Sequence, residues 1–181
     1  MESIDQKFYE IDKLISTYRS SDLSCEGEVE RQGNRAVKIV SGLTDIIKNG
    51  SLTNESQLGE RICKIVDDIN KDDRGMSIWD FSCTYGDKSN EPLMSFLKEL
   101  AIRKFIPQID KIFRCDYLGG LPLVSLLSSG ISKEKFMEEV FILLPQEYRD
   151  RLSKERIGLD PADENSPMAH CYPKLIGWCH D

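Results

Sequence analysis

Histidine is scarce in this sequence: the 181 residues contain only two, His170 and His180, close to the end of the chain. Histidine is the side chain that most often serves as a general base at neutral pH and as a metal ligand. The sequence also lacks the G-x-S-x-G turn of a serine hydrolase, a Walker-type glycine loop and the H-E-x-x-H pair of a metalloprotease. These absences argue against the common catalytic constellations, and we expect no enzymatic activity and no cofactor.

Long hydrophobic runs are also missing. The longest apolar stretch, residues 118–127 (LGGLPLVSLL), falls well short of the ~20 apolar residues that span a bilayer, and glycine and proline interrupt it. The first ten residues, MESIDQKFYE, are acidic where a signal peptide would be basic and then apolar. We therefore expect a cytoplasmic protein that has no membrane partner. Its six scattered cysteines then predict free thiols, because the cytosol keeps thiols reduced.

Positive charge is in deficit, since 24 lysines and arginines stand against 31 aspartates and glutamates, for a formal net charge of −7. A general nucleic-acid binder needs a basic surface, so we expect no direct nucleic-acid partner. The same acidity suits a basic protein partner, because complementary charge steers association; simple solubility is the alternative explanation. Residues 1–90 hold 17 acids and 12 bases, and residues 91–181 hold 14 and 12, so the first half carries more of the excess.

What the sequence has in abundance is helical periodicity, often with capping or breaking residues at the ends of the apolar stripes. The stripes cover residues 4–18, 29–47, 58–69, 93–100, 109–113, 121–127, 132–143 and 148–156. They predict an all-α fold, a single-domain irregular helical bundle of about seven to nine helices over residues 1–158. Residues 159–181 contain three prolines and apolar anchors without a period, which predicts a non-helical C-terminal tail docked on the bundle.

Three local features of the first half can be checked against a structure. Ser3 followed by Gln6 resembles a capping box, which would start the first helix almost at the terminus. Gly33 and Gly42 weaken the second helix, which could be two pieces. Apolar residues in 76–86 alternate as in a strand, but no second strand-like segment is available for pairing, so we favour a short helix.

The helix after residue 130 carries a start signal of its own. Ser132 is a suitable N-cap, with Ile131 before it and Phe136 placed to form a hydrophobic staple. From this start we expect the core-facing residues to be Phe136, Met137, Val140 and Leu143.

Two patterns resemble metal sites without completing one. Soft or borderline ligands gather in the tail: His170, Cys171, Cys179 and His180. Adjacent residues seldom reach one metal, and this spacing fits none of the usual zinc motifs. The acidic run at 67–75 begins like an EF-hand loop, yet Asp73 stands where glycine is needed and Trp79 where glutamate is needed. We therefore expect no metal.

No motif matches a specific protein family. The profile of a small, acidic, all-helical cytoplasmic chain without a catalytic set nevertheless resembles that of immunity and antitoxin proteins. Such proteins bind and block a basic toxin domain, and nuclease toxins are typical targets because they must bind phosphate. The resemblance implies a direct protein–protein inhibitor with a basic toxin as its partner. A non-catalytic adaptor, regulator or host-directed effector is the alternative, and a small enzyme that uses the tail cysteines and histidines is the third.

Candidate contacts for a basic partner are the acids in loops and at helix ends of the first half, where carboxylates can reach outward. An aromatic residue of the tail is a further candidate anchor. The candidates are Glu26, Glu28, Glu30, Asp67, Asp68, Asp72, Asp73 and Trp178. The sequence therefore predicts a partner-binding acidic surface formed mainly by residues 1–90.

Overall fold

The computed structural model describes residues 3–50, 55–71, 78–84, 90–113 and 130–154, and within these ranges all regular structure is helical. The helices are α1 (Ile4–Ser20), α2 (Glu28–Asn49), α3 (Glu55–Asn70), α4 (Ile78–Thr84), α5 (Glu91–Ile102), α6 (Ile106–Phe113), α8 (Gly130–Glu139), the 3-10 helix η2 (Phe141–Leu143) and α9 (Gln146–Lys154). The described residues contain no strand, so the predicted all-α class is confirmed.

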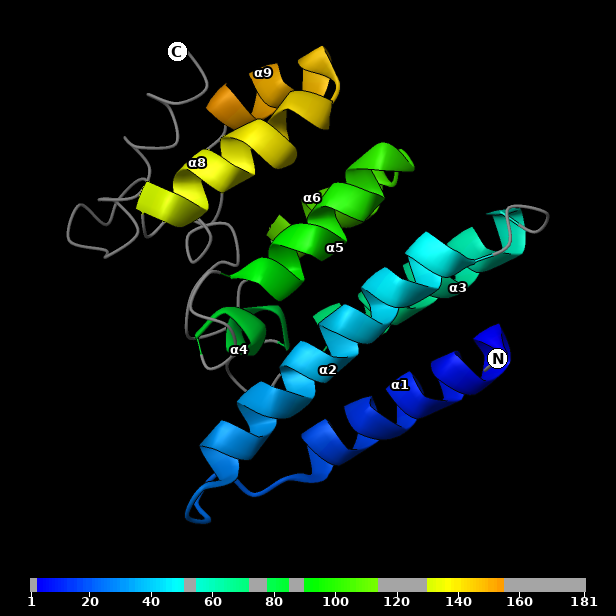
Figure 1. Ribbon diagram of the computed structural model, residues 1–181, viewed down its shortest axis with the longest axis vertical. Helices are drawn as coiled ribbons and strands as arrows, with labels where there is room; N and C mark the ends of the chain where they lie inside the picture. Colours follow the sequence, from blue (N-terminus) through cyan, green and yellow to red (C-terminus); the bar gives the residue numbers. More distant parts are fainter. Residues whose placement is uncertain (1–2, 51–54, 72–77, 85–89, 114–129, 155–181) are drawn as a thin grey trace.

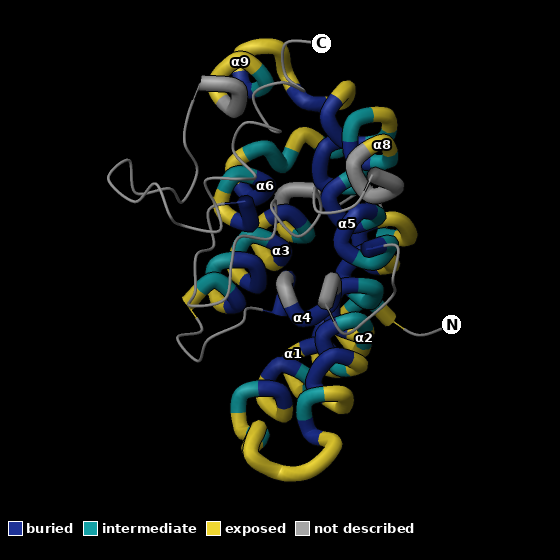
Figure 2. The backbone as a smooth tube through the Cα atoms, turned by 90° about the vertical axis from the view of Figure 1, so that its left-hand side faces the viewer, coloured by how far each residue is buried: buried dark blue, intermediate teal, exposed yellow. Residues whose placement is uncertain are grey.

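Helix α2 is the centre of the bundle. It packs against α1 on one side and against α4 and α5 on the other, while α6 contacts α3 and α5. Figure 1 shows α1 and α2 side by side, with α8 and α9 at the opposite end of the molecule from the α1–α2 connection. Buried residues follow the inward faces of the helices, as Figure 2 shows, and form one contiguous core.

The first helix begins where its cap predicts. The backbone N–H of Gln6 donates to Oγ of Ser3 at 3.2 Å, which satisfies one of the free donors of the first turn. The buried face consists of Phe8, Ile11, Ile15 and Tyr18, at the expected helical spacing. This part of the sequence analysis is confirmed.

Helix α2 is continuous in spite of its two glycines, so the possibility of two pieces is excluded. A Cβ atom at Gly42 would lie 3.2 Å from Cδ1 of Ile11. Glycine at this position therefore allows α1 to approach α2 closely, and the packing offsets the low helix propensity of glycine.

The ambiguous segment at 76–86 contains the short helix α4, as favoured from the sequence. The ring of Trp79 is fully buried and stacks on Phe96 of α5, with centroids 5.7 Å apart. Its Nε1–H donates to Oδ1 of Asn70 at the end of α3, at 2.8 Å. One side chain thus connects three helices and gives a buried polar atom its partner.

Two expectations about the helix after residue 130 are wrong. Helix α8 begins at Gly130, so Ser132 lies inside the first turn and is not the N-cap. Leu143 is 40% exposed instead of facing the core, because α8 ends at Glu139 and the tighter 3-10 turn changes the phase of the side chains. Phe141 and Leu144 are buried in its place, while Phe136 and Val140 face the core as predicted.

Some expectations fall outside the described residues. These are the apolar segment at 121–127, the domain boundary at 158/159 and the tail with His170, Cys171, Cys179 and His180. In the described part of the chain, no helix is long and apolar enough to cross a membrane. No group of three or more histidine, cysteine or acidic residues that could hold a metal occurs within the same ranges.

Candidate protein-binding surface at the α1–α2 turn

The connection between α1 and α2 forms an exposed end of the molecule, seen as the lower loop in Figure 2. We call residues 21–30 the tip. Four of its side chains are exposed and suited to contact a partner: Asp22, Leu23, Glu26 and Glu30. Leu23 is 43% exposed and is the tip's large apolar side chain at the surface. The tip therefore combines three exposed acids with one apolar contact.

Local hydrogen bonds fix the backbone of the tip. Oδ1 of Asp22 accepts from the backbone N–H of Ser24 at 2.9 Å and from its hydroxyl at 2.6 Å. These bonds lower the pKa of Asp22, so its negative charge persists into acid. Gly27 then adopts a left-handed conformation with φ of 73°, which glycine accepts without strain, and α2 starts at the next residue.

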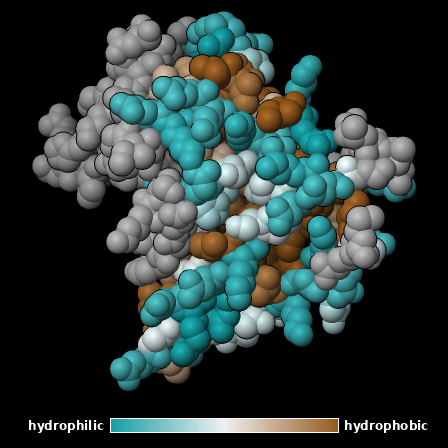
Figure 3. Space-filling view, in the orientation of Figure 1, coloured by the Kyte–Doolittle hydropathy of each residue, from teal (hydrophilic) through white to brown (hydrophobic). Residues whose placement is uncertain are grey.

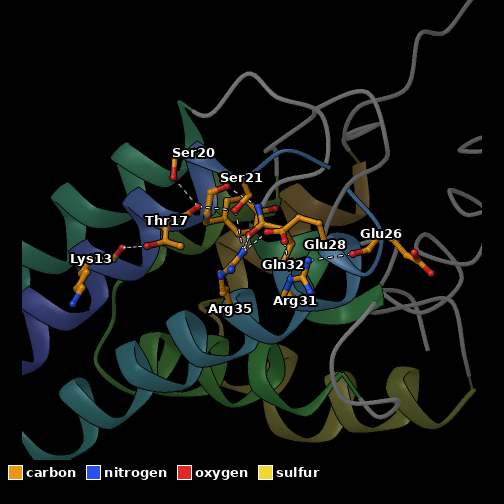
Figure 4. Close-up of polar contacts among 10 residues, drawn as sticks. Lys13, Thr17, Ser20, Ser21, Glu26, Glu28, Arg31, Gln32 and Arg35 are labelled. Atoms are coloured by element: carbon orange, nitrogen blue, oxygen red, sulfur yellow. Dashed lines mark hydrogen bonds and ion pairs between the residues drawn. The ribbon is translucent and has the colours of Figure 1, made fainter. Parts of the chain in front are cut away.

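Beneath the tip lies a partly buried ion-pair cluster, drawn in Figure 4. The side chain of Glu28 is only 11% exposed. Its Oε1 accepts from Nη1 of Arg35 at 2.6 Å, and its Oε2 accepts from Nε of Arg31 at 2.7 Å. The hydrogen bond from Arg35, followed by that from Arg31, lowers the pKa of Glu28 from an ordinary 4.5 to about 2.

The same cluster joins the end of α1 to the start of α2. Nη1 of Arg35 also lies 2.8 Å from Oε1 of Gln32 and 2.9 Å from Oγ of Ser21. The buried Gln32 donates from Nε2 to the backbone carbonyl of Tyr18 at 2.6 Å, in the last turn of α1. We call Glu28, Arg31, Gln32 and Arg35 the tip support, because they hold the turn on which the exposed acids stand.

Of the predicted contact residues, Glu26 and Glu30 fit the prediction best. Both are exposed, and neither carboxylate forms an ion pair with another described residue. Nη2 of Arg31 donates to the backbone carbonyl of Glu26 at 3.1 Å, which fixes its position. The expectation that Glu28 reaches outward is wrong, because its carboxylate turns inward to two arginines.

Asp67 and Asp68 lie at the end of α3 and are already engaged within the molecule. Asp67 pairs with Nζ of Lys111 on α6 at 2.7 Å. Asp68 pairs with Nη1 of Arg19 at 3.2 Å, and Nη2 of Arg19 donates to the backbone carbonyl of Asp68 at 2.6 Å. These two acids connect helices, so they are less available to a partner than the tip acids. Asp72, Asp73 and Trp178 lie outside the described residues.

A groove of about 780 Å³ runs between α1 and α3, and we call its walls the seam. Arg61 bridges the helices there, because its Nη1 lies 2.5 Å from Oδ1 of Asp5 and its guanidinium lies 3.8 Å from the ring centroid of Phe8. The charged residues of the lining have both signs: Asp12, Glu60, Asp67, Asp68, Arg61, Lys64 and Lys71. The seam therefore does not present a field of one sign.

Cys63 also lines the groove and is only partly buried. Burial raises the pKa of its thiol, and the nearby carboxylate of Asp67 raises it further. A nucleophilic cysteine needs the opposite shift, because the thiolate is the reactive form. The groove thus provides no activated thiol.

The sequence analysis missed two residues of the tip, Asp22 and Leu23. The stretch from 20 to 27 is recognisable as a polar turn, but only the structure shows that Asp22 and Leu23 are exposed on it, as Glu26 and Glu30 are. Comparisons of this chain with protein families, with characterised proteins and with solved structures find no match. The functional argument therefore depends on the geometry of the chain's own residues.

Proposed function

We propose that this chain acts by binding a basic protein partner through the tip and occluding the partner's functional surface. The observation that carries the proposal is the combination of exposed acids, Asp22, Glu26 and Glu30, with a fixed backbone beneath them. An interface gains affinity when its groups are held in place before binding, because less conformational entropy is lost.

The composition of the tip matches what a protein interface requires. Leu23 offers exposed apolar area, and the exposed carboxylates of the same turn offer charge. Acids of this kind attract a basic partner from a distance and speed association. A standard interface buries about 800 Å² on each side, so the contact would extend from the tip onto the adjoining surfaces of α1 and α2.

The partner class that suits these features best is a basic toxin domain, and a nuclease toxin is the foremost example. A nuclease presents positive charge where it binds phosphate, and outward carboxylates on a fixed turn would compete for that charge. The chain would then serve as an immunity or antitoxin protein, which needs no catalytic residue of its own.

The test begins with affinity capture of the partner from cells that carry the gene, followed by identification by mass spectrometry. Binding of the captured protein is then measured at low and high ionic strength, for the wild type and for the double reversal Glu26→Lys/Glu30→Lys. We expect a basic partner, association that slows as salt rises, and at least about tenfold weaker binding by the reversal. If the partner is toxic, co-expression of the wild type should restore growth.

Circular dichroism of the reversal variant serves as the control for folding, because both side chains are exposed and their replacement should leave the helices intact. Binding that is insensitive to salt and survives the reversal would contradict the electrostatic proposal. A captured partner that is acidic would contradict it as well.

A further inference from the structure

Two arginines differ from the other arginines of the described chain. Five described arginines form ion pairs: Arg19, Arg31, Arg35, Arg61 and Arg151. Arg103 and Arg149 form none within the described residues, although the protein has a net charge of −7. The Nε atom of each is buried and has no hydrogen-bond acceptor among those residues. Nη2 of Arg149 donates to Oε1 of Gln146 at 2.7 Å. Because a guanidinium carries five N–H donors, both arginines retain Nη–H donors for a carboxylate ligand.

The two arginines lie at the same end of the molecule. Arg103 follows the last residue of α5, and α5 contacts η2. Arg149 on α9 lies with its guanidinium 5.9 Å from the ring centroid of Phe141 in η2. Lys104, next to Arg103, is exposed and adds a third positive charge that has no ion pair with a described residue. This region, the α5–η2 end, is remote from the tip in Figure 1.

The α5–η2 end also exposes large apolar side chains. Ile102 at the end of α5 is 52% exposed, and Ile142 and Leu143 in η2 are 61% and 40% exposed. In Figure 3 hydrophobic surface is visible near the top of the molecule, over the region of η2 and the end of α5. An exposed apolar group beside positively charged side chains is typical of a recognition surface.

We infer that the α5–η2 end binds an acidic peptide segment that carries large apolar side chains. The planar guanidinium presents Nη donors that match a carboxylate. Ile102, Ile142 and Leu143 accept the apolar side chains of the peptide. A long polyanion suits the surface less well, because nucleic acids and anionic membranes would also meet the negative field of the whole protein.

This inference goes beyond the proposed function, because the two surfaces have opposite charge and lie at opposite ends of the molecule. The tip would take a basic partner and the α5–η2 end an acidic one. A chain with both surfaces can connect two proteins, as an adaptor does. Failure of either proposal leaves the other unaffected.

The test uses the full chain and a set of fluorescein-labelled twelve-residue peptides that contain four glutamates and four leucines in different orders. Fluorescence anisotropy measures the Kd. We expect at least one peptide to bind, and binding to weaken about tenfold in Arg103→Gln or Arg149→Gln. Ile142→Ser should weaken it several-fold, because apolar contact is lost. Circular dichroism of each variant confirms that it is folded.

Matched control variants distinguish a specific site from nonspecific electrostatic or hydrophobic binding. Lys13→Gln removes one positive charge from the exposed surface of α1, and Tyr9→Ser removes an exposed ring that is 63% accessible. Both variants should bind the peptide as the wild type does. The inference is overturned if no peptide binds at concentrations up to 1 mM. A Kd above 1 mM corresponds to a binding free energy weaker than about 4 kcal/mol. It is also overturned if Lys13→Gln weakens binding as much as Arg103→Gln does, or if vesicles containing phosphatidylserine bind and the peptides do not.

Discussion

The tip and the seam both contain acidic and basic side chains, but these side chains have different roles in the two regions. At the tip, one carboxylate, Glu28, is turned inward to two arginines, and its neighbours Glu26 and Glu30 are left exposed. At the seam, Asp67 and Asp68 of α3 pair with bases from other helices, Lys111 and Arg19 respectively. The tip has its fixed turn and its free acids in one short segment. At the seam, the negative charges of the paired carboxylates are neutralised by bases of the same chain.

An acidic residue at the end of a helix is therefore not always available to a partner. What decides its role is whether a base from another part of the chain reaches it. Exposed ion pairs of the seam type contribute little stability, because water and salt screen them. Within the tip support, Gln32 and Glu28 contribute more to stability, because their side chains are largely withdrawn from solvent and would lose their hydrogen-bond partners.

The largest effect that sharpens this comparison is expected at Gln32. Gln32→Leu removes the hydrogen bond to the carbonyl of Tyr18 and the acceptor for Arg35, both in the tip support. We expect a loss of about 2 kcal/mol in the free energy of unfolding, because buried polar groups lose their partners. Urea denaturation measures it. Gln57→Leu, at an exposed position on α3, is the control and should change stability by less than about 0.5 kcal/mol. Equal effects of the two substitutions would show that the tip has no special support.

The second prediction concerns acid. The pKa of Glu28 is about 2 in the folded chain and ordinarily 4.5, so the carboxylate contributes stability that is fully present above pH 4.5. This contribution is lost as the pH falls from about 4.5 to about 2. In Glu28→Gln the loss is absent, so stability should fall less steeply with acid than in the wild type. Urea unfolding midpoints at several pH values measure the two slopes, and parallel curves would contradict the role assigned to Glu28.

A smaller effect is expected at the seam. Asp68→Asn breaks the ion pair with Arg19, in which the two side chains are 56% and 33% exposed respectively. The loss of stability should be about 0.5 kcal/mol and should shrink further at 1 M salt. A loss of 2 kcal/mol or more in the free energy of unfolding would mean that the seam stabilises the protein as much as the tip support does, which would contradict the distinction between them.

The smallest effect on stability is expected for the exposed tip acids. Glu26→Gln/Glu30→Gln should leave the free energy of unfolding within about 0.5 kcal/mol of the wild type, because neither carboxylate has an ion-pair partner among the described residues. Thermal and urea denaturation both measure this. A clear destabilisation would mean that these acids serve the fold instead of a partner.

Much of the fold could be predicted, because its signals are local. The Ser3 cap and the apolar stripe of α1 depend on residues three and four apart. The short helix α4 (Ile78–Thr84) follows from the lack of a strand to pair with. Ser132 and Leu143 were predicted wrongly for one reason: a 3-10 turn and an earlier helix start change which side chains face inward. Periodicity does not report such changes of phase.

The candidate site could be predicted only in part. Glu28, Arg31, Gln32 and Arg35 stand at helical spacing, so their mutual contact is visible in the sequence. Whether these side chains point inward depends on how the end of α1 packs against the start of α2, and the sequence does not show this packing. The partners of Asp67 and Asp68 lie 44 and 49 residues away along the chain, at Lys111 and Arg19. Contacts at that separation depend on how the helices pack.

We propose that the acids of the tip, and not those of the seam, contact the basic partner. The most direct measurement compares Glu26→Gln/Glu30→Gln with Asp67→Asn/Asp68→Asn, because each pair of substitutions removes two negative charges. The Kd for the captured partner is measured by surface plasmon resonance at low salt. The account predicts that the tip variant binds about tenfold more weakly and that the seam variant stays within about twofold of the wild type. Equal weakening by both variants, or a larger loss in the seam variant, would contradict it.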